Sequence, residues 1–408
     1  MTTNIPVSVS SLLLRSPYLD ITLSAQTGQS TIFNIISGKS YEVSPAVVSI
    51  LDFFKQPATA ESLLETTDTN GELVDQTLAF LERTGLLIDS STEGWERFTT
   101  DVIAVKNRLF GVDAYHSRAE VVIVGIPFGK GNGKSAGGAE FPFYIREFSQ
   151  NNNLLLKGAD FLLFDTLTAT RLQPLFRGGK VADYGNLFIS ANESTAFVYA
   201  KIYEVASQLF DAGRIPAFIG GDHSISYPLI QAAARHYPDL HVIHFDAHTD
   251  TYGSRYDKVA HWGKVHHYGN FMTKCLELPN VHHVYQFGIR GFANVGARPR
   301  PGQHIFWRQQ VSEQLRQGGS FDLPDDVPYY ITFDVDVLDP TVLPGTATPV
   351  AGGFTLEEVK HLFEQLLPGR RIVGFDLVEA NPDFDRTDLT AQVALEILLR
   401  LMSYLPIL

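Results

Sequence analysis

The sequence has a single cysteine, Cys275, among 408 residues. One thiol excludes a disulfide within the chain, and it excludes a metal site built from several thiolates. A chain of this kind suits a reducing compartment, so we expect a cytoplasmic protein.

Positive charge and long apolar runs are also scarce. The chain has 32 basic against 45 acidic residues, a net charge of −13, which argues against phosphate-backbone binding as its main task. The start lacks a basic segment followed by an apolar one, and no stretch is apolar over the length of a membrane span. We therefore predict no nucleic-acid partner, no membrane partner and no export signal.

Hydrophobic residues make up 44% of the chain, enough for a large core, and its length predicts two domains. Residues 1–90 are predicted to form a small α+β domain. Alternating apolar and polar residues in 21–44 predict short antiparallel strands. Three helix signals follow, with Ser44 and Pro45 at the first start and Gly85 just past the last end.

A linker is predicted over residues 91–118, and a second domain over residues 119–408. In this second domain, apolar runs that end in Gly, Asp or His alternate with helical stretches. Strands buried on both faces, with helices between them, predict an α/β fold with a mostly parallel sheet covered on two sides. Ligands bind such sheets at the carboxyl ends of the strands.

Acidic and histidine side chains gather at those carboxyl ends. Asp246, His248 and Asp250 follow one apolar run at a spacing of two, which turns them to one side of an extended chain. Asp334 and Asp336 follow another run at the same spacing. The sequence thus predicts that these side chains meet in one crevice.

His223 follows a third run, which brings the set to four carboxylates and two imidazoles. That many buried anions repel one another unless cations neutralise them. Two divalent ions meet this need, and ligands of oxygen and imidazole favour Mn2+, with Ni, Co or Fe as alternatives. A lone Asp at a strand end is more often a cap or a turn residue, as we expect for Asp222 and Asp339.

Three motifs resemble the metal-binding motifs of the ureohydrolases, the arginase and agmatinase family. They are GGDHS at Gly220–Ser224, FDAHTD at Phe245–Asp250 and TFDVDVLDP at Thr332–Pro340. The Gly-rich segment 124–147 and the segments 344–355 and 374–382 also resemble this family. The resemblance spans residues 119–408 and implies an arginase-like three-layer αβα fold.

The resemblance implies a site for two Mn2+ ions. One ion would be held by His223, Asp246, Asp250 and Asp334, and the other by Asp246, His248, Asp334 and Asp336. Glu379 would bind the guanidinium of the substrate, because a carboxylate suits that planar set of donors.

The same resemblance implies the chemistry. A hydroxide bridging the metals attacks the guanidinium carbon, Asp250 passes a proton to the departing amine, and urea is released. A histidine exchanges protons with the solvent, and the segment His261–Met272 offers three candidates. His267 aligns best with the family, with His266 as the alternative.

Residues 1–90 resemble the PqqD-like, winged-helix-like domains that bind leader peptides of ribosomally made, modified peptides. The resemblance rests on the order of the predicted elements and on YEVS, LLET and FLERTGLLI. It implies a peptide arginase, which converts arginine to ornithine in a precursor peptide whose leader is held by residues 1–90. Gly291 stands where arginases acting on free arginine carry an Asp, and agmatinases share this Gly.

The alternative is an agmatinase- or guanidinobutyrase-like hydrolase of small guanidino compounds. Residues 1–90 would then form a winged-helix-like domain for assembly or regulation, since a fold does not determine a function. In either case the family resemblance implies a closed homo-oligomer.

Overall fold

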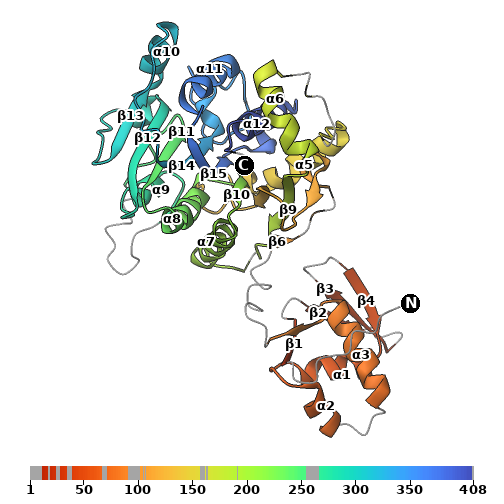
Figure 1. The fold of residues 1–408 in the computed structure, drawn as a ribbon. Helices are drawn as coiled ribbons and strands as arrows, with labels where there is room; N and C mark the ends of the chain where they lie inside the picture. The colour runs from red at the N-terminus through yellow and green to blue at the C-terminus, as the bar shows by residue number, and fades with distance from the viewer. Residues whose placement is uncertain are drawn as a thin grey trace. The chain divides into compact units, whose positions relative to one another are not determined.

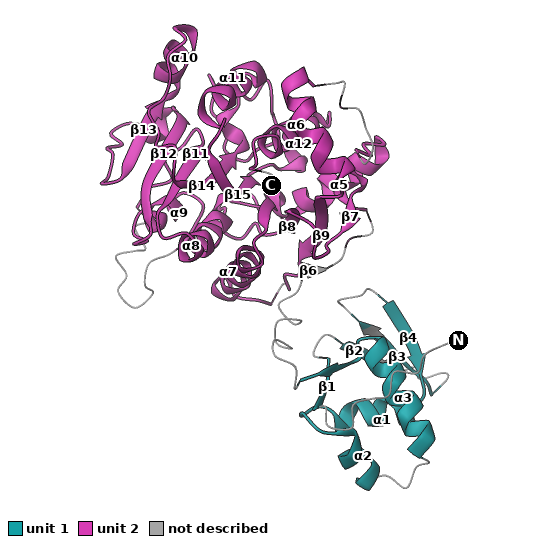
Figure 2. Ribbon diagram, in the orientation of Figure 1, with its two compact units in different colours: residues 1–103 teal, residues 104–408 magenta. Residues whose placement is uncertain are grey.

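The computed structural model comprises two compact units, residues 1–103 and residues 104–408 (Figure 2). The structure describes residues 12–16, 19–23, 28–34, 39–66, 71–90, 102–103, 105, 107–156, 161, 164–190, 192–253 and 266–406. Among these residues, no helix has the length and apolar character needed to cross a membrane.

The first unit combines short strands with three helices (Figure 1). Its strands are β1 (Leu13–Arg15), β2 (Leu19–Leu23), β3 (Ser30–Asn34), β4 (Lys39–Val43) and β5 (Leu87–Asp89), and its helices are α1 (Pro45–Phe53), α2 (Ala60–Thr66) and α3 (Gly71–Arg83). A further strand, β6 (Val102–Ile103), lies at the end of residues 1–103 and is not part of the sheets of this unit. Strands β2, β3 and β4 form an antiparallel sheet, as the alternation of apolar and polar residues predicts. The sequence did not indicate β1, which pairs with β5 in a separate two-stranded sheet.

The helices of this unit begin and end where the local sequence favours it. Helix α1 begins at Pro45 directly after Ser44, and the Thr59 hydroxyl accepts the Ser62 N–H at 3.2 Å at the start of α2. Gly85 follows α3 in left-handed backbone, with a φ of +70° that glycine adopts without strain. The helices bury a common core that includes Leu51, Phe54, Leu63, Leu78 and Leu81.

The second unit is a parallel sheet with helices packed against it (Figure 1). Its strands are β7 (Asp113–Ala114), β8 (Val121–Ile126), β9 (Val181–Leu187), β10 (Ile215–Gly220), β11 (Leu240–Phe245), β12 (Val281–Ile289), β13 (Gln303–Trp307), β14 (Pro328–Asp334) and β15 (Arg371–Val378). Its helices are α5 (Phe141–Asn151), α6 (Thr166–Arg177), α7 (Thr195–Asp211), α8 (Ser226–His236), α9 (Phe271–Cys275), α10 (Arg308–Arg316), α11 (Leu356–Leu366) and α12 (Leu389–Met402).

Alternate residues of the central strands face opposite sides of this sheet. Val121 and Ile123 of β8 belong to a core that also contains residues of α5, α11 and α12. Val122 and Val124 of the same strand are equally buried, so the other face is covered as well. The predicted three-layer αβα fold with a mostly parallel sheet is therefore confirmed.

The strand order explains how distant residues meet. The sheet runs β13-β12-β11-β14-β15-β10-β8-β9, with β7 beside β9, so β11, β14, β15 and β10 are consecutive neighbours. Because these strands are parallel, their carboxyl ends share one edge. The predicted metal ligands and Glu379 lie at the ends of these four strands or shortly after them.

Three strands and one boundary differ from the sequence prediction. The runs predicted as strands are β8, β10, β11, β12, β14 and β15, whereas β7, β9 and β13 were not predicted. Polar residues and Gly185 interrupt the apolar pattern of β9, and β13 is a short edge strand. Leu109 and Phe110 lie in the core of the second unit, so its structure begins within the predicted linker 91–118.

Candidate metal centre

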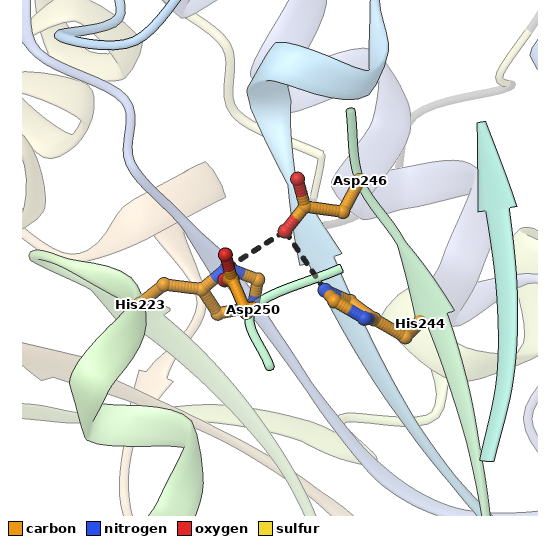
Figure 3. Close-up of side chains that lie close together, drawn as sticks. All are labelled: His223, His244, Asp246 and Asp250. Carbon is orange, nitrogen blue, oxygen red and sulfur yellow. Dashed lines mark hydrogen bonds and ion pairs between the residues drawn. The ribbon is translucent and has the colours of Figure 1, made fainter. Parts of the chain in front are cut away.

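His223 lies among three carboxylates at the carboxyl edge of the sheet. Its Nδ1 atom is 3.1 Å from Asp246 Oδ2, 3.2 Å from Asp250 Oδ2 and 3.2 Å from Asp334 Oδ2. Figure 3 shows His223, Asp246 and Asp250 close together, with the His244 ring beside Asp246. Ligand atoms of these four labelled residues lie within 4.8 Å of one another.

A second group adjoins the first and shares Asp246. His248 Nδ1 lies 3.0 Å from Asp336 Oδ2 and 3.4 Å from Asp246 Oδ1. The Thr348 hydroxyl donates to Asp336 Oδ2 at 3.0 Å and so holds that carboxylate in place. The structure thus brings all six predicted ligands together, with Asp334 joined to the first group through His223.

The backbone at the strand ends turns these side chains inward. Asp246 comes directly after β11, and Asp250 lies in left-handed backbone with a φ of +48°. Asp334 is the last residue of β14, and its Oδ1 accepts the N–H of Asp336 at 2.7 Å in the 3-10 turn η6 (Val335–Val337). At two neighbouring strands, a short turn therefore directs acidic side chains that are two residues apart in the sequence toward the same point.

The tautomer of His223 follows from its other ring nitrogen. Thr332 donates its only hydroxyl hydrogen to Asp376 at 2.7 Å, so it accepts from His223 Nε2 at 2.8 Å. In the neutral form of the ring, the Nδ1 atom of His223 then carries a lone pair, which faces three carboxylate oxygens. A buried lone pair among anions needs a cation between them, as in a histidine that ligates a metal.

The pKa values of the carboxylates also indicate that the site needs cations. Burial, and then the charge of Asp246, raise the pKa of Asp250 to about 7. Burial and the charges of Asp336 and Asp246 raise the pKa of Asp334 well above its usual range. These acids resist sharing one buried site as anions, and divalent cations remove that repulsion. The residues present therefore fit a binuclear metal site.

The sequence pattern did not indicate His244, although this residue precedes Asp246 by two positions on β11. Gln286 donates both amide hydrogens, one to the Thr249 carbonyl at 2.8 Å and one to His244 Nδ1 at 2.7 Å. Its Oε1 atom accepts from Gln303 at 2.5 Å, which fixes this amide orientation. His244 therefore carries its hydrogen on Nε2 and donates it to Asp246, so it supports a ligand rather than binding a metal itself.

Glu379 lies next to this centre, directly after β15. It occupies left-handed backbone with a φ of +64°, and its side chain is 3% exposed. Oε1 accepts the backbone N–H of His223 at 2.8 Å, and Oε2 accepts from Asn132 Nδ2 at 2.9 Å. Burial, followed by the charge of Asp222, raises the pKa of Glu379 to about 8, which a cationic partner would reverse.

The two described histidines of the loop differ in their surroundings. His266 packs against the rings of Tyr199 at 4.6 Å and Tyr227 at 4.7 Å. Burial, and then Lys274, lower the pKa of His266 to about 3, which leaves it uncharged at neutral pH. His267 is half-buried, and its Nδ1 accepts the Gly269 N–H at 3.1 Å. The third candidate, His261, lies outside the described residues.

Asp222 and Asp339 have the structural roles expected of lone acids. Asp222 accepts the Ser224 N–H at 3.0 Å and the Gly131 N–H at 2.7 Å. Asp339 accepts the N–H groups of Gly352 and Gly353, at 2.8 Å and 3.0 Å. Both carboxylates hold loops beside the centre.

The loop after β12 carries Gly291 in left-handed backbone, with a φ of +79°. A Cβ atom at this position would lie 2.7 Å from Val350 Cγ1. The preceding Arg290 is buried, and its guanidinium donates only to backbone carbonyls, among them Asp336 at 2.7 Å and Val350 at 2.7 Å. Arg290 therefore ties the metal-ligand turn to the loop at Val350.

The sequence of the second unit matches known proteins over almost its whole length. A sequence model of the arginase family matches residues 119–403. The chain belongs to the arginase family. It is thus a ureohydrolase, a metal-dependent hydrolase of C–N bonds in guanidino compounds, and enzymes of this family bind a binuclear metal site.

Relatives of this ureohydrolase include agmatinases. The agmatinase of Sodalis glossinidius (strain morsitans) is 34% identical over 297 residues, which cover 71% of this chain and 88% of the relative. A hypothetical agmatinase from Burkholderia thailandensis has a similar structure, with a TM-score of 0.60 and 25% identity over 74% of this chain and 90% of the other. The proclavaminate amidino hydrolase of Streptomyces clavuligerus shares the fold, with a TM-score of 0.59 and 24% identity over 74% of this chain and 97% of the other.

Proposed function

We propose that this ureohydrolase converts a primary alkylguanidinium to an alkylamine and urea. One observation carries the proposal: Glu379, a buried carboxylate, is held by His223 N–H beside the group of acids and imidazoles. A carboxylate in that place pairs with a guanidinium and presents its carbon to the metal centre. The name agmatinase, shared by the relatives at 33–34% identity, supports a substrate of this class.

The metal ligands and their chemistry follow from the donor set. Two divalent cations, which we propose to be Mn2+, would be held by His223, Asp246, His248, Asp250, Asp334 and Asp336, and would supply Lewis acidity and an activated water.

Three protein groups then act on the substrate. Glu379 binds and orients the guanidinium through its carboxylate. Asp250, whose carboxylate lies 3.2 Å from His223 Nδ1 at the metal centre, carries a proton to the nitrogen of the departing amine. His267 exchanges protons with the solvent, since it is half-buried, whereas His266 is packed between two tyrosines.

The substrate class that the comparisons support best is a small guanidino compound such as agmatine. This was the alternative in the sequence analysis, and the names of the relatives favour it over the peptide arginase. Gly291 is consistent with it, because the position offers no side chain for the α-amino group of free arginine.

A second candidate is the arginine side chain of a precursor peptide, and the first unit favours it. Residues 1–118 lie outside the family match, and the first unit has the short strands followed by three helices on which the resemblance to a leader-binding domain rests. Residues 1–103 contain 13 acidic and five basic residues, a balance that attracts an arginine-containing peptide. An extended leader would add a strand to an edge of the β2-β3-β4 sheet.

One experiment separates the two substrates. Full-length enzyme with Mn2+ is given agmatine, free arginine or a leader-bearing arginine peptide, and urea release is compared as kcat/KM. Conversion of peptide arginine to ornithine also lowers the peptide mass by about 42 Da for each residue, as the release of urea after addition of water requires. Faster turnover of agmatine than of the peptide supports the first class, and the reverse supports the second.

The Glu379→Gln variant tests the proposed reaction itself. It keeps the shape of the side chain and removes the charge that pairs with the guanidinium. We expect kcat/KM to fall about 100-fold or more on the active substrate, with the metal content unchanged. Urea release equal to that of the wild type would refute the role of Glu379.

A further inference from the structure

A glycine-rich loop, residues 129–138, lies close against the ends of β10 and β15. The Gly131 N–H donates to Asp222 Oδ2 at 2.7 Å, and the Tyr268 N–H donates to the Gly131 carbonyl at 3.2 Å. A Cβ atom at Gly131 would lie 2.1 Å from Ser224 Oγ, so this contact permits only glycine. The loop is therefore held in a defined position beside His223.

Asn132 projects from this loop with a fixed amide orientation. Its Oδ1 atom accepts the backbone N–H of Lys134 at 2.9 Å, and it also faces the N–H of Ser135 at 3.4 Å. Because the oxygen is used within the loop, the amide nitrogen is the atom that points to Glu379. Nδ2 lies 2.9 Å from Glu379 Oε2, and Asn132 is 7% exposed.

Glu379 is thereby held at both oxygens by donors from different parts of the chain. Oε1 accepts from the backbone of His223, which follows β10, and Oε2 accepts from the loop. Two donors on opposite oxygens fix the rotation of the carboxylate about its last bond. Each oxygen keeps a second lone pair, and the two together match the parallel N–H groups of a guanidinium.

We propose that Asn132 is a positioning residue for the guanidino substrate, acting through Glu379. The inference rests on the proposed function of Glu379 and extends it to a residue 247 positions away in the sequence. Asn132 keeps the carboxylate in the plane that receives the guanidinium. The glycine-rich loop thus sets how tightly the enzyme binds the charged group of its substrate.

Two substitutions separate this role from a purely structural one. Asn132→Asp keeps an oxygen for the Lys134 N–H and so preserves the turn, but it places a carboxylate against Glu379. Asn132→Ala removes the turn acceptor and the donor together. A positioning role makes Asp the more harmful change, whereas a role confined to the turn makes Ala the more harmful one.

The experiment uses full-length Mn2+-loaded enzyme with the active substrate identified above, and guanidinium ion as a competitive inhibitor. We expect Asn132→Ala to raise KM and the inhibition constant of guanidinium about 10- to 100-fold, and Asn132→Asp to raise them further. Metal content and Tm should stay near those of the wild type in the Asp variant. Lys134→Ala, which changes an exposed side chain of the same loop, is the matched control and should leave all constants unchanged.

The outcomes that overturn the inference differ from those that overturn the proposed function. An active wild type in which Asn132→Asp binds guanidinium normally refutes the positioning role and leaves the ureohydrolase function intact. Loss of metal from Asn132→Asp in proportion to its loss of guanidinium binding also refutes it. A wild type that releases no urea from any of the guanidino substrates refutes both proposals.

Discussion

The Nε2 atom of His244 lies 2.8 Å from Oδ2 of Asp246, the carboxylate shared by both groups of the metal centre. Gln286 occupies the other ring nitrogen of His244, so the imidazole is a donor toward Asp246. A carboxylate that receives such a hydrogen bond keeps its orientation when a metal binds.

Replacing His244 should therefore weaken metal binding without removing a ligand. In His244→Phe the ring contact with Phe271, at 5.7 Å, is kept and the hydrogen bond is lost. We expect metal affinity to fall about 10- to 100-fold, measured by competition with a chelator. His283→Asn, on the neighbouring strand but at its amino end, is the control. Equal metal affinity in His244→Phe and the control would contradict the supporting role.

Asp250→Asn tests the ligand set directly. Asparagine tolerates left-handed backbone well, so a φ of +48° should be kept and the protein should fold. We expect urea release to fall at least about 1,000-fold, because a metal ligand and a proton carrier are lost together. Circular dichroism and Tm give the control for folding. Substantial urea release by a folded Asp250→Asn enzyme would show that the metal assignment is wrong.

Removing divalent cations should lower stability as well as activity. Without cations, Asp246, Asp250 and Asp334 face one another within a buried site. Dialysis against a chelator should abolish urea release and lower Tm by several degrees, and Mn2+ should restore both. A Tm that is the same with and without Mn2+ would indicate that the groups do not bind the ion in the folded protein.

Gly291→Ala should destabilise the catalytic unit. The residue has a φ of +79°, and the added Cβ would lie 2.7 Å from Val350 Cγ1. We expect a loss of about 1–3 kcal/mol in the free energy of unfolding, measured with denaturant. Gly253→Ala is the control, since a Cβ there meets no atom within 4 Å. A loss no larger than that of Gly253→Ala would show that the loop adapts.

His241, which lies near the amino end of β11, should make the stability of the protein depend on pH. Burial, followed by the charge of His283, lowers the pKa of His241 to about 4, against Asp239, which raises it. The unfolded chain then binds the proton more readily, so stability falls as the pH drops from about 6.5 to about 4. In His241→Gln this part of the pH dependence, about 1–3 kcal/mol, should be absent. Parallel unfolding curves from pH 8 to pH 4.5 test it, and identical slopes in both proteins would contradict it.

The local features of this protein were accessible from its sequence because they depend on neighbours along the chain. Pro45 after Ser44 marks the start of α1, and Gly85 marks the end of α3. The spacing of Asp246, His248 and Asp250 indicates candidate metal ligands, since one turn after a strand directs their side chains together. Strand β9 was not predicted, because polar residues and Gly185 interrupt its apolar pattern. Its residues are buried by the layers that cover the sheet.

The sequence by itself determined the candidate metal ligands and Glu379, while the tertiary structure decided how those residues are held. Asn132 and Glu379 meet only because β15 lies beside β10 and the glycine-rich loop rests on that edge. By its position alone His244 could be a metal ligand, but the hydrogen bonds of Gln286 and Gln303 place the ring hydrogen of His244 on Nε2. Hydrogen-bond direction and carboxylate orientation depend on partners that are distant in sequence, so they arise only when the sheet is assembled.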